Sequence, residues 1–215
     1  MGIKISKLYE KGMNESLFGL GFSHGLTSDL SFEEFCHSKQ LYERMMGIAN
    51  KLAFKGNGES KFLESIVVCL DIEAPIYFWS EFDTYRVGIT KQSTSTMHTL
   101  LKDGFDFTTN IREKINNRIE DEMLREKIAD YFLMAHSIIQ DVKLDDNIDI
   151  ATKKTIAKSI LPSSFNQRRI VVTNYKVLQN MYVQRYNHQL QEWKDFCKFI
   201  SNDGTYKSHW ICENK

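Results

Sequence analysis

The fold is decided by residues 161–200, LPSSFNQRRIVVTNYKVLQNMYVQRYNHQLQEWKDFCKFI. The β-branched run at residues 168–172 is too short for a helix and predicts a strand. Thr173 or Asn174 then offers a side-chain oxygen as an N-cap, and one long helix is predicted to follow as far as Ile200. The apolar side chains of this helix share one face. They are Leu178, Met181, Tyr182, Leu190, Trp193, Cys197 and Ile200.

Arg185 stands in the widest gap of this apolar stripe, three residues beyond Tyr182, on the side predicted to face the core. Burying an unpaired charge costs several kcal/mol, so this guanidinium needs a partner. One alternative is an Asp or Glu from elsewhere in the core. The other is a phosphate or carboxylate ligand, which the planar fork of Arg binds through two parallel hydrogen bonds.

The same stretch resembles the C-terminal part of the flavin-dependent thymidylate synthases. That family has an Arg-x-x-Leu-Pro turn, a strand, a helix that begins Asn-x-Arg-Ser-Leu, and a later Arg followed by Ala-Gln. No gap is needed to match residues 161–191 to this pattern. The matching positions are Lys158, Leu161, Pro162, Asn174, Lys176, Leu178, Arg185 and Gln191. Two of these, Lys158 and Lys176, are Arg in the family, so the charge is kept and the bidentate fork is lost.

A second part of the resemblance lies in the N-terminal half. Ser60 and Glu64 fall on a Ser and a Glu of the family's histidine-containing motif. Ala74 and Pro75 fall on the Ala-Pro pair that follows the family's next strand. The chain has two prolines in all, and both Pro75 and Pro162 lie at family proline positions.

Three segments depart from the family pattern. Gly58 takes the place of a His. Thr84, Tyr85 and Arg86 take the place of the family's Arg-His-Arg. The family's Asn-Glu-x-Ser-x-Arg-Tyr corresponds to KQSTSTM at residues 91–97, where Ser93 or Thr94 falls on the Ser and the following Arg is missing. This Ser/Thr cluster fits an ordinary polar loop as well as an anion site, and both interpretations stay open.

The resemblance implies a reaction in which a reduced flavin takes electrons from NADPH and methylenetetrahydrofolate supplies one carbon to C5 of deoxyuridylate (dUMP). It also implies a homotetramer whose active sites are each built from more than one subunit. The positions implied for nucleotide binding are Arg185, Lys158, Ser93, Thr94 and Gln92. The positions implied for FAD are Arg86, Asn174, Lys176, Ser60 and Tyr85. No catalytic residue is assigned.

The functional hypothesis is therefore a divergent enzyme of this family that acts on a pyrimidine deoxynucleotide, with FAD, NADPH and methylenetetrahydrofolate. Two alternatives remain. One is a pyrimidine hydroxymethylase of the same fold, with an altered flavin side. The other is a protein that keeps the fold and a nucleotide pocket without catalysis, since function depends on the site and not on the fold.

Composition limits the class of partner. Lys+Arg and Asp+Glu both number 28, so the net charge of zero gives no argument for a nucleic-acid polymer or an anionic membrane surface. No apolar run is long enough for a membrane span, and the N-terminus lacks the apolar core of a signal peptide. Four cysteines without Cys-x-x-Cys spacing predict free buried thiols in a reducing cytoplasm. No metal site is predicted, because no two histidines share helix-face spacing with another ligand.

The remaining segments complete an α+β prediction: a small mixed or antiparallel sheet with long helices, in one domain over residues 1–215. Residues 1–30 are predicted to be irregular, and a capping box at residues 31–34 to begin a helix that reaches Leu52. A half-buried strand is predicted at residues 66–72. Two amphipathic helices are predicted at residues 109–143 and 151–160.

Overall fold

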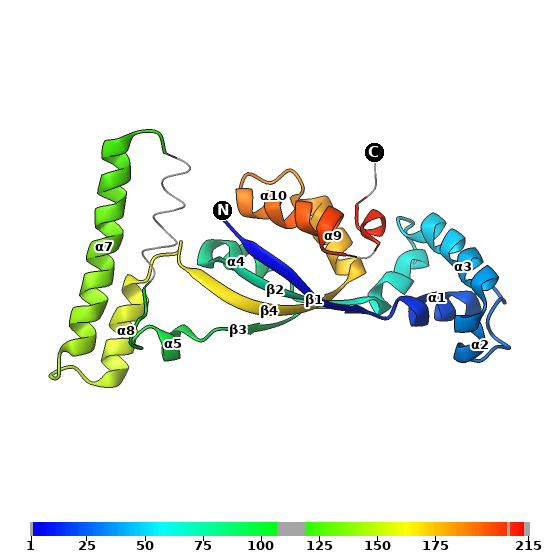
Figure 1. The fold of residues 1–215 in the computed structure, drawn as a ribbon, viewed down its shortest axis with the longest axis horizontal. Helices are drawn as coiled ribbons and strands as arrows, with labels where there is room; N and C mark the ends of the chain where they lie inside the picture. Colours follow the sequence, from blue (N-terminus) through cyan, green and yellow to red (C-terminus); the bar gives the residue numbers. More distant parts are fainter. Residues whose placement is uncertain (1, 107–118, 206, 213–215) are drawn as a thin grey trace. The chain divides into compact units, whose positions relative to one another are not determined.

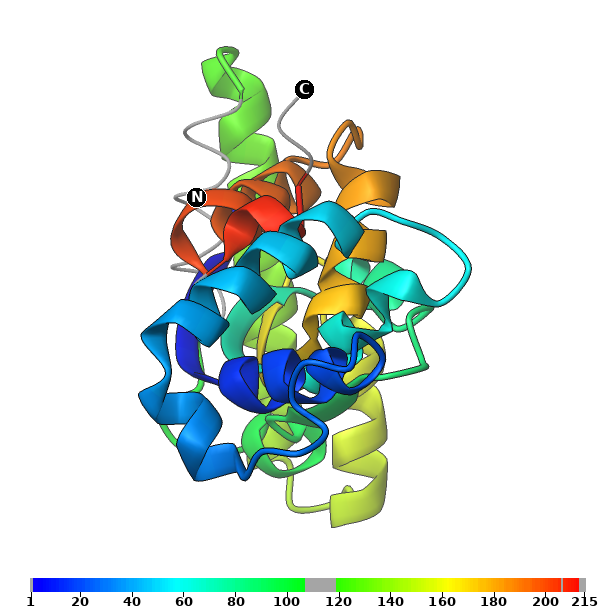
Figure 2. The same ribbon diagram turned by 90° about the vertical axis from the view of Figure 1, so that its right-hand side faces the viewer.

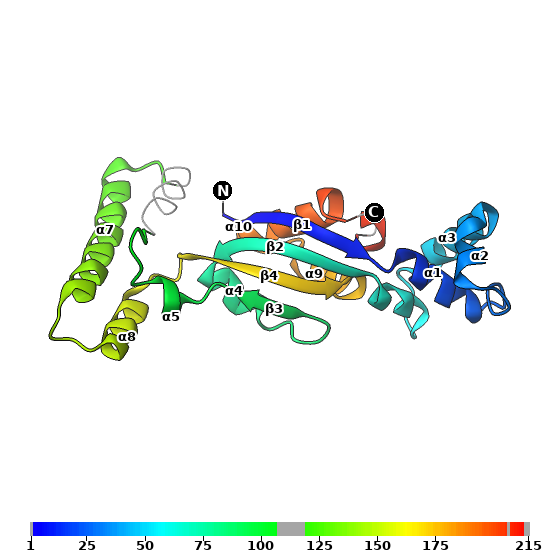
Figure 3. The same ribbon diagram turned by 60° about the horizontal axis from the view of Figure 1, so that its bottom comes forward.

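The computed structural model of this protein describes residues 2–106, 119–205 and 207–212. Its helices and its four-stranded antiparallel sheet confirm the predicted α+β class. The strand order is β1-β2-β4-β3 (Figure 3). Internal contacts divide the chain into two compact units. The first unit comprises residues 1–4, 72–84 and 92–169, and the second comprises residues 5–71, 85–91 and 170–215. A single domain over the whole chain stays a prediction.

Each of the four strands contributes residues to both units. The strands are β1 (Lys4–Lys11), β2 (Val67–Pro75), β3 (Thr90–Ser93) and β4 (Asn166–Asn174). The helices of the first unit are α4 (Ile76–Phe82), α5 (Thr96–Thr99), α7 (Glu122–Leu144) and α8 (Ile150–Ile160). Those of the second unit are α1 (Met13–Phe22), α2 (Phe32–His37), α3 (Lys39–Leu52), the 3₁₀-helix η1 (Glu59–Ser65), α9 (Tyr175–Arg185), α10 (Gln191–Lys198), the π-helix η2 (Phe199–Asp203) and the 3₁₀-helix η3 (Ser208–Trp210).

Strands β2 and β4 are antiparallel neighbours. The Ile76 N–H donates to the Phe165 carbonyl just beyond one end of the pair, and the Tyr175 N–H donates to the Ile66 carbonyl beyond the other, both at 3.0 Å. Strand β2 is central in the sheet, and most of its side chains are buried. The predicted strands at residues 66–72 and 168–172 are thus confirmed, each a few residues longer than expected.

In the second unit, α1, α2 and α3 pack on one another (Figures 1 and 2). Helix α2 begins at Ser31 with the predicted capping box, in which Ser31 and Glu34 bond each other's backbone N–H groups. Helices α9 and α10 bury a second apolar group that includes Tyr175 and Trp193. The Tyr175 hydroxyl is hydrogen-bonded to Glu10 and accepts from the Lys207 N–H. Burial, followed by the Glu10 contact, raises the pKa of Tyr175 far above its usual range.

In the first unit, α7 and α8 enclose a small apolar core with α5 and the chain that follows it. Its buried members are Leu100, Ala135, Ile139 and Ala157. Partly buried apolar side chains surround them, among them Phe105 and Phe132. The described part of the helix predicted over residues 109–143 is α7, and residues 107–118 lie outside the described part of the chain. Helix α8 confirms the prediction at residues 151–160.

Several predicted boundaries were wrong. Residues 4–22 form β1 and α1 where an irregular segment was expected, and the helix expected to reach Leu52 is divided at Ser38. The helix expected to reach Ile200 ends at Arg185, and α10 starts at Gln191. The break falls in the gap of the apolar stripe, because residues 186–189 contribute no side chain to that stripe. Residues 90–93 are a strand and not a loop.

None of the helices in the described ranges is both long and apolar enough to cross a membrane. Cys69, Cys197 and Cys212 are buried free thiols, as predicted, whereas Cys36 is exposed.

The α7–α8 core predicts the effect of a truncation at its centre. Ile139 is fully buried, so Ile139→Ala leaves a cavity and is expected to lower the free energy of unfolding by about 2–5 kcal/mol. Ser137→Ala on the same helix is the matched control, because Ser137 is exposed and lies outside the apolar core. Its effect is expected to stay within about 0.5 kcal/mol. Urea denaturation measures both, and equal losses would contradict this assignment of the core.

Candidate functional site

The start of helix α9 carries two of the residues predicted to hold a flavin. Asn174 ends β4, and its side-chain oxygen accepts the Val177 N–H at 3.0 Å, so it is the predicted N-cap. Lys176 donates from Nζ to Ser60 Oγ and to Gln179 Oε1, both at 2.8 Å. The structure thus brings together Ser60 and Lys176, which match separate motifs of the family. Two of the three N–H donors of Lys176 are used in these bonds.

Gln179 anchors this group in the interior. Its side chain is buried, and its amide nitrogen donates to the carbonyls of Ala53 and Trp210, each at 2.9 Å. A buried polar group that lost these partners would cost free energy, so the network holds η1, the end of α3 and η3 against α9. Sequence reasoning missed Gln179, although a polar side chain on the apolar side of the predicted helix is the same signal that singled out Arg185.

Arg185 is the last residue of α9 and lies against two aromatic rings. Its Cζ is 4.8 Å from the centroid of the Trp193 ring and 5.6 Å from that of Tyr85. Its Nε–H donates to the Tyr85 hydroxyl at 3.0 Å, and this hydroxyl donates to Gln184 Oε1 at 2.8 Å. Trp193 is fully buried, so the rings form a rigid support for the guanidinium. The structure therefore brings Tyr85 and Arg185 together.

The charge of Arg185 also acts on a buried thiol. Burial raises the pKa of Cys197 to about 12, and the Arg185 guanidinium opposes this rise. Because the pKa stays far above neutral pH, Cys197 remains protonated and is not a nucleophile there. The thiol is an apolar neighbour of Arg185 and not a catalytic group.

The loop after Tyr85 carries Arg86, which is exposed. Two residues later, Gly88 has a positive φ of 71° and lies against the start of α9. A Cβ atom at Gly88 would lie 2.9 Å from Val177 Cγ2 and 3.2 Å from Asn174 Nδ2. This close approach sets the position of the loop relative to the N-cap of α9.

A cavity of about 760 Å³ lies between α1 and the loop that precedes η1. Its lining includes Gly58 and charged or titratable side chains of both signs, which are Glu15, His24, Lys55, Glu59 and Lys61. A Cβ atom at Gly58 would meet no atom within 4 Å, so the position of the family's His opens onto free space. The volume lies in the range typical of small-molecule sites.

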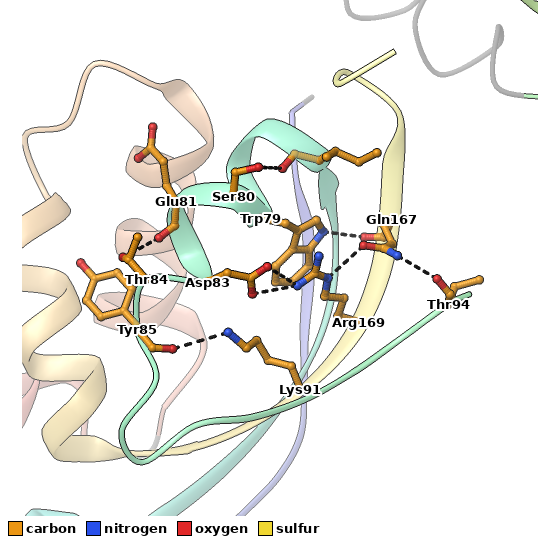
Figure 4. Close-up of polar contacts among 11 residues, drawn as sticks. Trp79, Ser80, Glu81, Asp83, Thr84, Tyr85, Lys91, Thr94, Gln167 and Arg169 are labelled. Atoms are coloured by element: carbon orange, nitrogen blue, oxygen red, sulfur yellow. Dashed lines mark hydrogen bonds and ion pairs between the residues drawn. The ribbon is translucent and has the colours of Figure 1, made fainter. Parts of the chain in front are cut away.

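In the first unit, an ion pair that sequence reasoning missed joins α4 to β4 (Figure 4). Arg169 Nη1 donates to both carboxylate oxygens of Asp83, at 2.9 and 3.0 Å. The guanidinium lies 4.4 Å from the centroid of the Trp79 ring, whose Nε1–H donates to the Gln167 carbonyl. The Arg169 Nε–H donates to Gln167 Oε1 at 3.0 Å. Arg169 thus has an internal Asp partner.

The Gln167 side chain extends this group to the predicted anion segment. Its amide nitrogen donates to the Thr94 carbonyl at 2.8 Å, and the Thr94 N–H and hydroxyl both donate to the Arg168 carbonyl. Thr94 also lines a cavity of about 230 Å³. Other polar residues of its lining are Glu73, Thr96, Thr99, Asn166 and Arg168. Glu73 adds a carboxylate to this lining and the Thr94 hydroxyl already donates to a carbonyl, so this cavity by itself does not favour an anion.

The predicted site residues therefore fall into two groups. Those in the second unit are Ser60, Tyr85, Arg86, Asn174, Lys176 and Arg185. Those in the first unit are Gln92, Ser93, Thr94 and Lys158. Gln92 and Ser93 are on β3, and Lys158 is an exposed residue in the last turn of α8. Lys158 is not among the residues that line the cavity at Thr94.

The packing of Gly88 predicts a selective effect of a methyl group. Gly88→Ala is expected to destabilise the protein by about 1–2 kcal/mol for the left-handed backbone and by a further ~1–3 kcal/mol for the contact with Val177. Gly25→Ala is the control, because Gly25 has a φ of 61° with open space around its Cβ position. It is expected to show the backbone cost alone in urea denaturation. A Gly88 variant no less stable than the Gly25 variant would show that the close approach does not matter.

No family model matches this sequence, and no curated protein matches it. Solved structures do match. A crystal structure of thymidylate synthase X (ThyX) from Helicobacter pylori with FAD and dUMP is similar over 97% of this chain and 95% of its own, with a TM-score of 0.66 and 15% sequence identity. A second structure of the same flavin-dependent enzyme, complexed with FAD and dUMP, gives 96% of each chain, a TM-score of 0.66 and 15% identity.

At this identity the similarity shows the fold alone. It covers nearly the whole length of both chains, so it includes the helical parts as well as the sheet. The chain has a fold like that of flavin-dependent thymidylate synthases.

Proposed function

We propose that this protein binds a pyrimidine deoxynucleotide, with dUMP as the first candidate, and transfers a one-carbon group from methylenetetrahydrofolate to its C5 atom. The observation that supports the proposal most is the placement of Arg185 against Tyr85 and Trp193, in a chain whose structural neighbours hold dUMP and FAD. An Arg held in a fixed orientation suits a phosphate, because its terminal nitrogens bind two oxygens at once.

In this proposal, Arg185 binds the phosphate and fixes the position of the nucleotide. Lys158, Gln92, Ser93 and Thr94 keep their predicted assignment to the nucleotide. Orienting the substrate is the main contribution that these residues make, because one-carbon transfer needs C5 held close to the donor carbon. The proposal keeps the homotetramer that the resemblance implies, in which each site is built from more than one subunit.

The donor set of the second unit fits a flavin. Arg86, Asn174 and Lys176 supply N–H donors, which match the oxygen and nitrogen acceptors of a flavin and its diphosphate. FAD would accept electrons from NADPH and supply the two that reduce the transferred carbon to a methyl group. Asn174 and Lys176 are held in place by the cap of α9 and by Ser60 and Gln179, so they are positioned before any ligand binds.

A second candidate function is supported by the bond between Ser60 and Lys176. Because these two predicted flavin contacts bind each other at 2.8 Å, the flavin side is partly satisfied by the protein itself. Gly58 and Tyr85 replace two histidines of the family pattern on the same side. These features are compatible with a pyrimidine hydroxymethylase of the same fold or with a nucleotide-binding protein without catalysis.

The phosphate role of Arg185 is tested by calorimetric titration of dUMP. Arg185→Ala is expected to weaken dUMP binding by about 10- to 100-fold, the value of charge-assisted hydrogen bonds. Arg44→Ala, which removes an exposed Arg of α3, is the control and is expected to bind like the unaltered protein. Unchanged affinity in Arg185→Ala would mean that Arg185 is an internal partner and not a ligand contact.

The flavin assignment is tested by the visible absorption of the purified protein after incubation with FAD and desalting. A retained flavin band, weakened in Lys176→Met, is the expected result. That protein is then assayed with NADPH, methylenetetrahydrofolate and dUMP for the methylated product. A protein that stays colourless while it binds dUMP would reject the flavoenzyme and favour the second candidate.

The proposed homotetramer has a candidate contact surface on α7. An apolar stripe separate from the face that packs in the α7–α8 core is formed by Met123, Leu124, Tyr131, Met134 and Ile138, each at least 40% exposed. Lys127 and Asp141 lie on the same side, seven residues before and after Met134. In an antiparallel pair of α7 helices centred on Met134, Lys127 of each copy faces Asp141 of the other, whereas a parallel pair would oppose like charges.

A charge in the centre of this stripe is expected to disrupt self-association. Met134→Lys should give a lower mass than the unaltered protein in analytical ultracentrifugation, because the two introduced ammonium groups, one from each copy, would meet at the contact. The control is Ser137→Lys, an exposed position of α7 outside the stripe. An unchanged mass in Met134→Lys would exclude this surface from the assembly.

A further inference from the structure

Tyr85 occupies a position where the family that the sequence resembles has a His, and was therefore predicted to contact FAD. In the structure its side chain is instead committed to Arg185. Three groups form a directed chain of hydrogen bonds: the Arg185 Nε–H donates to the Tyr85 oxygen, and the Tyr85 O–H donates to Gln184 Oε1. The hydroxyl acts as acceptor and donor at once, so each of its polar atoms has a defined role.

The ring of Tyr85 contributes a second constraint. It lies edge-to-face with the buried Trp193, with ring centroids 6.0 Å apart, and both rings contact the guanidinium. A guanidinium that is bonded at Nε and contacts both rings is restrained in its orientation. Removing the hydroxyl would keep the ring contacts and lose the hydrogen bond that restrains rotation of the guanidinium.

The backbone around Tyr85 is itself held in place. The Lys91 amine donates to the Tyr85 carbonyl at 3.5 Å (Figure 4). Three residues after Tyr85, Gly88 is packed against Val177 and Asn174. The loop therefore presents the phenol to Arg185 from a fixed point. A phenol also extends further from the backbone than an imidazole, so a His at this point would not place a ring nitrogen where the Tyr85 oxygen accepts.

We propose that Tyr85 is a positioning residue that orients Arg185 for the nucleotide phosphate, and that it is not a flavin contact. This inference rests on the proposed phosphate role of Arg185. An Arg that is oriented before binding loses less side-chain freedom when the phosphate arrives, so affinity rises without any contact between Tyr85 and the ligand.

The test is a double-mutant cycle with dUMP as the titrant. Tyr85→Phe keeps the ring and is expected to weaken dUMP binding by about 10-fold, within the range for a hydrogen bond to a charged group. In an Arg185→Ala background the same change is expected to have no further effect, because the residue that it orients is gone. Tyr186→Phe is the matched control: Tyr186 is 59% exposed at the C-cap of α9, and dUMP affinity of this variant is expected to be unchanged.

Two outcomes would overturn the inference. One is full affinity in Tyr85→Phe, and the other is an equal loss in the presence and absence of Arg185, which would indicate direct contact between Tyr85 and the ligand. A measurement without ligand distinguishes failure of this inference from failure of the proposed function. In nitrogen-15 NMR spectra, the Arg185 Nε–H is expected to exchange slowly with water in the unaltered protein and quickly in Tyr85→Phe. If no nucleotide binds and this difference is present, the phosphate role fails while the positioning of Arg185 by Tyr85 stands; if the difference is absent, the positioning itself is wrong.

Discussion

At the junction between β4 and α9, the Val177 N–H donates to the side chain of Asn174. A cap of this kind contributes only about 1 kcal/mol, but its place in the chain gives it wider consequences. It sets where α9 begins, and thereby the positions of Lys176 in the first turn and Arg185 in the last. Gly88 packs against the same Asn side chain, so the loop that carries Tyr85 is aligned with the helix that carries Arg185.

Two arginines of this protein lie against aromatic rings and make different hydrogen bonds. Arg169 lies on Trp79 and donates to both oxygens of Asp83, so its charge is compensated inside its own unit and it joins α4 to β4. Arg185 also lies on aromatic rings, but its Nε–H is bonded to a neutral hydroxyl. The bidentate carboxylate contact gives Arg169 a structural role. The phosphate role of Arg185 is a proposal that rests on its held orientation and on its match to the family's nucleotide-binding Arg.

Local patterns predicted much of the fold. The capping box at Ser31, the N-cap at Asn174 and the alternation in β2 depend on residues a few positions apart, which is why sequence reasoning found them. It missed β1 because nearly all of this edge strand is exposed or half-buried, so KISKLYEK has no strong alternation of apolar and polar residues. It joined α9 to α10 because a periodic stripe with one gap does not distinguish a polar turn of helix from a break.

The sequence by itself determined the α+β class, the strands β2 and β4, the main caps and the composition that gives zero net charge. The motif positions also placed Arg185, Lys176, Ser60 and Tyr85 among the candidates. Only the tertiary structure decided which of them meet. The bonded pairs Ser60–Lys176, Tyr85–Arg185 and Asp83–Arg169 are separated by 116, 100 and 86 residues. Such contacts depend on how distant segments return to one another, and periodicity over a few residues carries no information about that return.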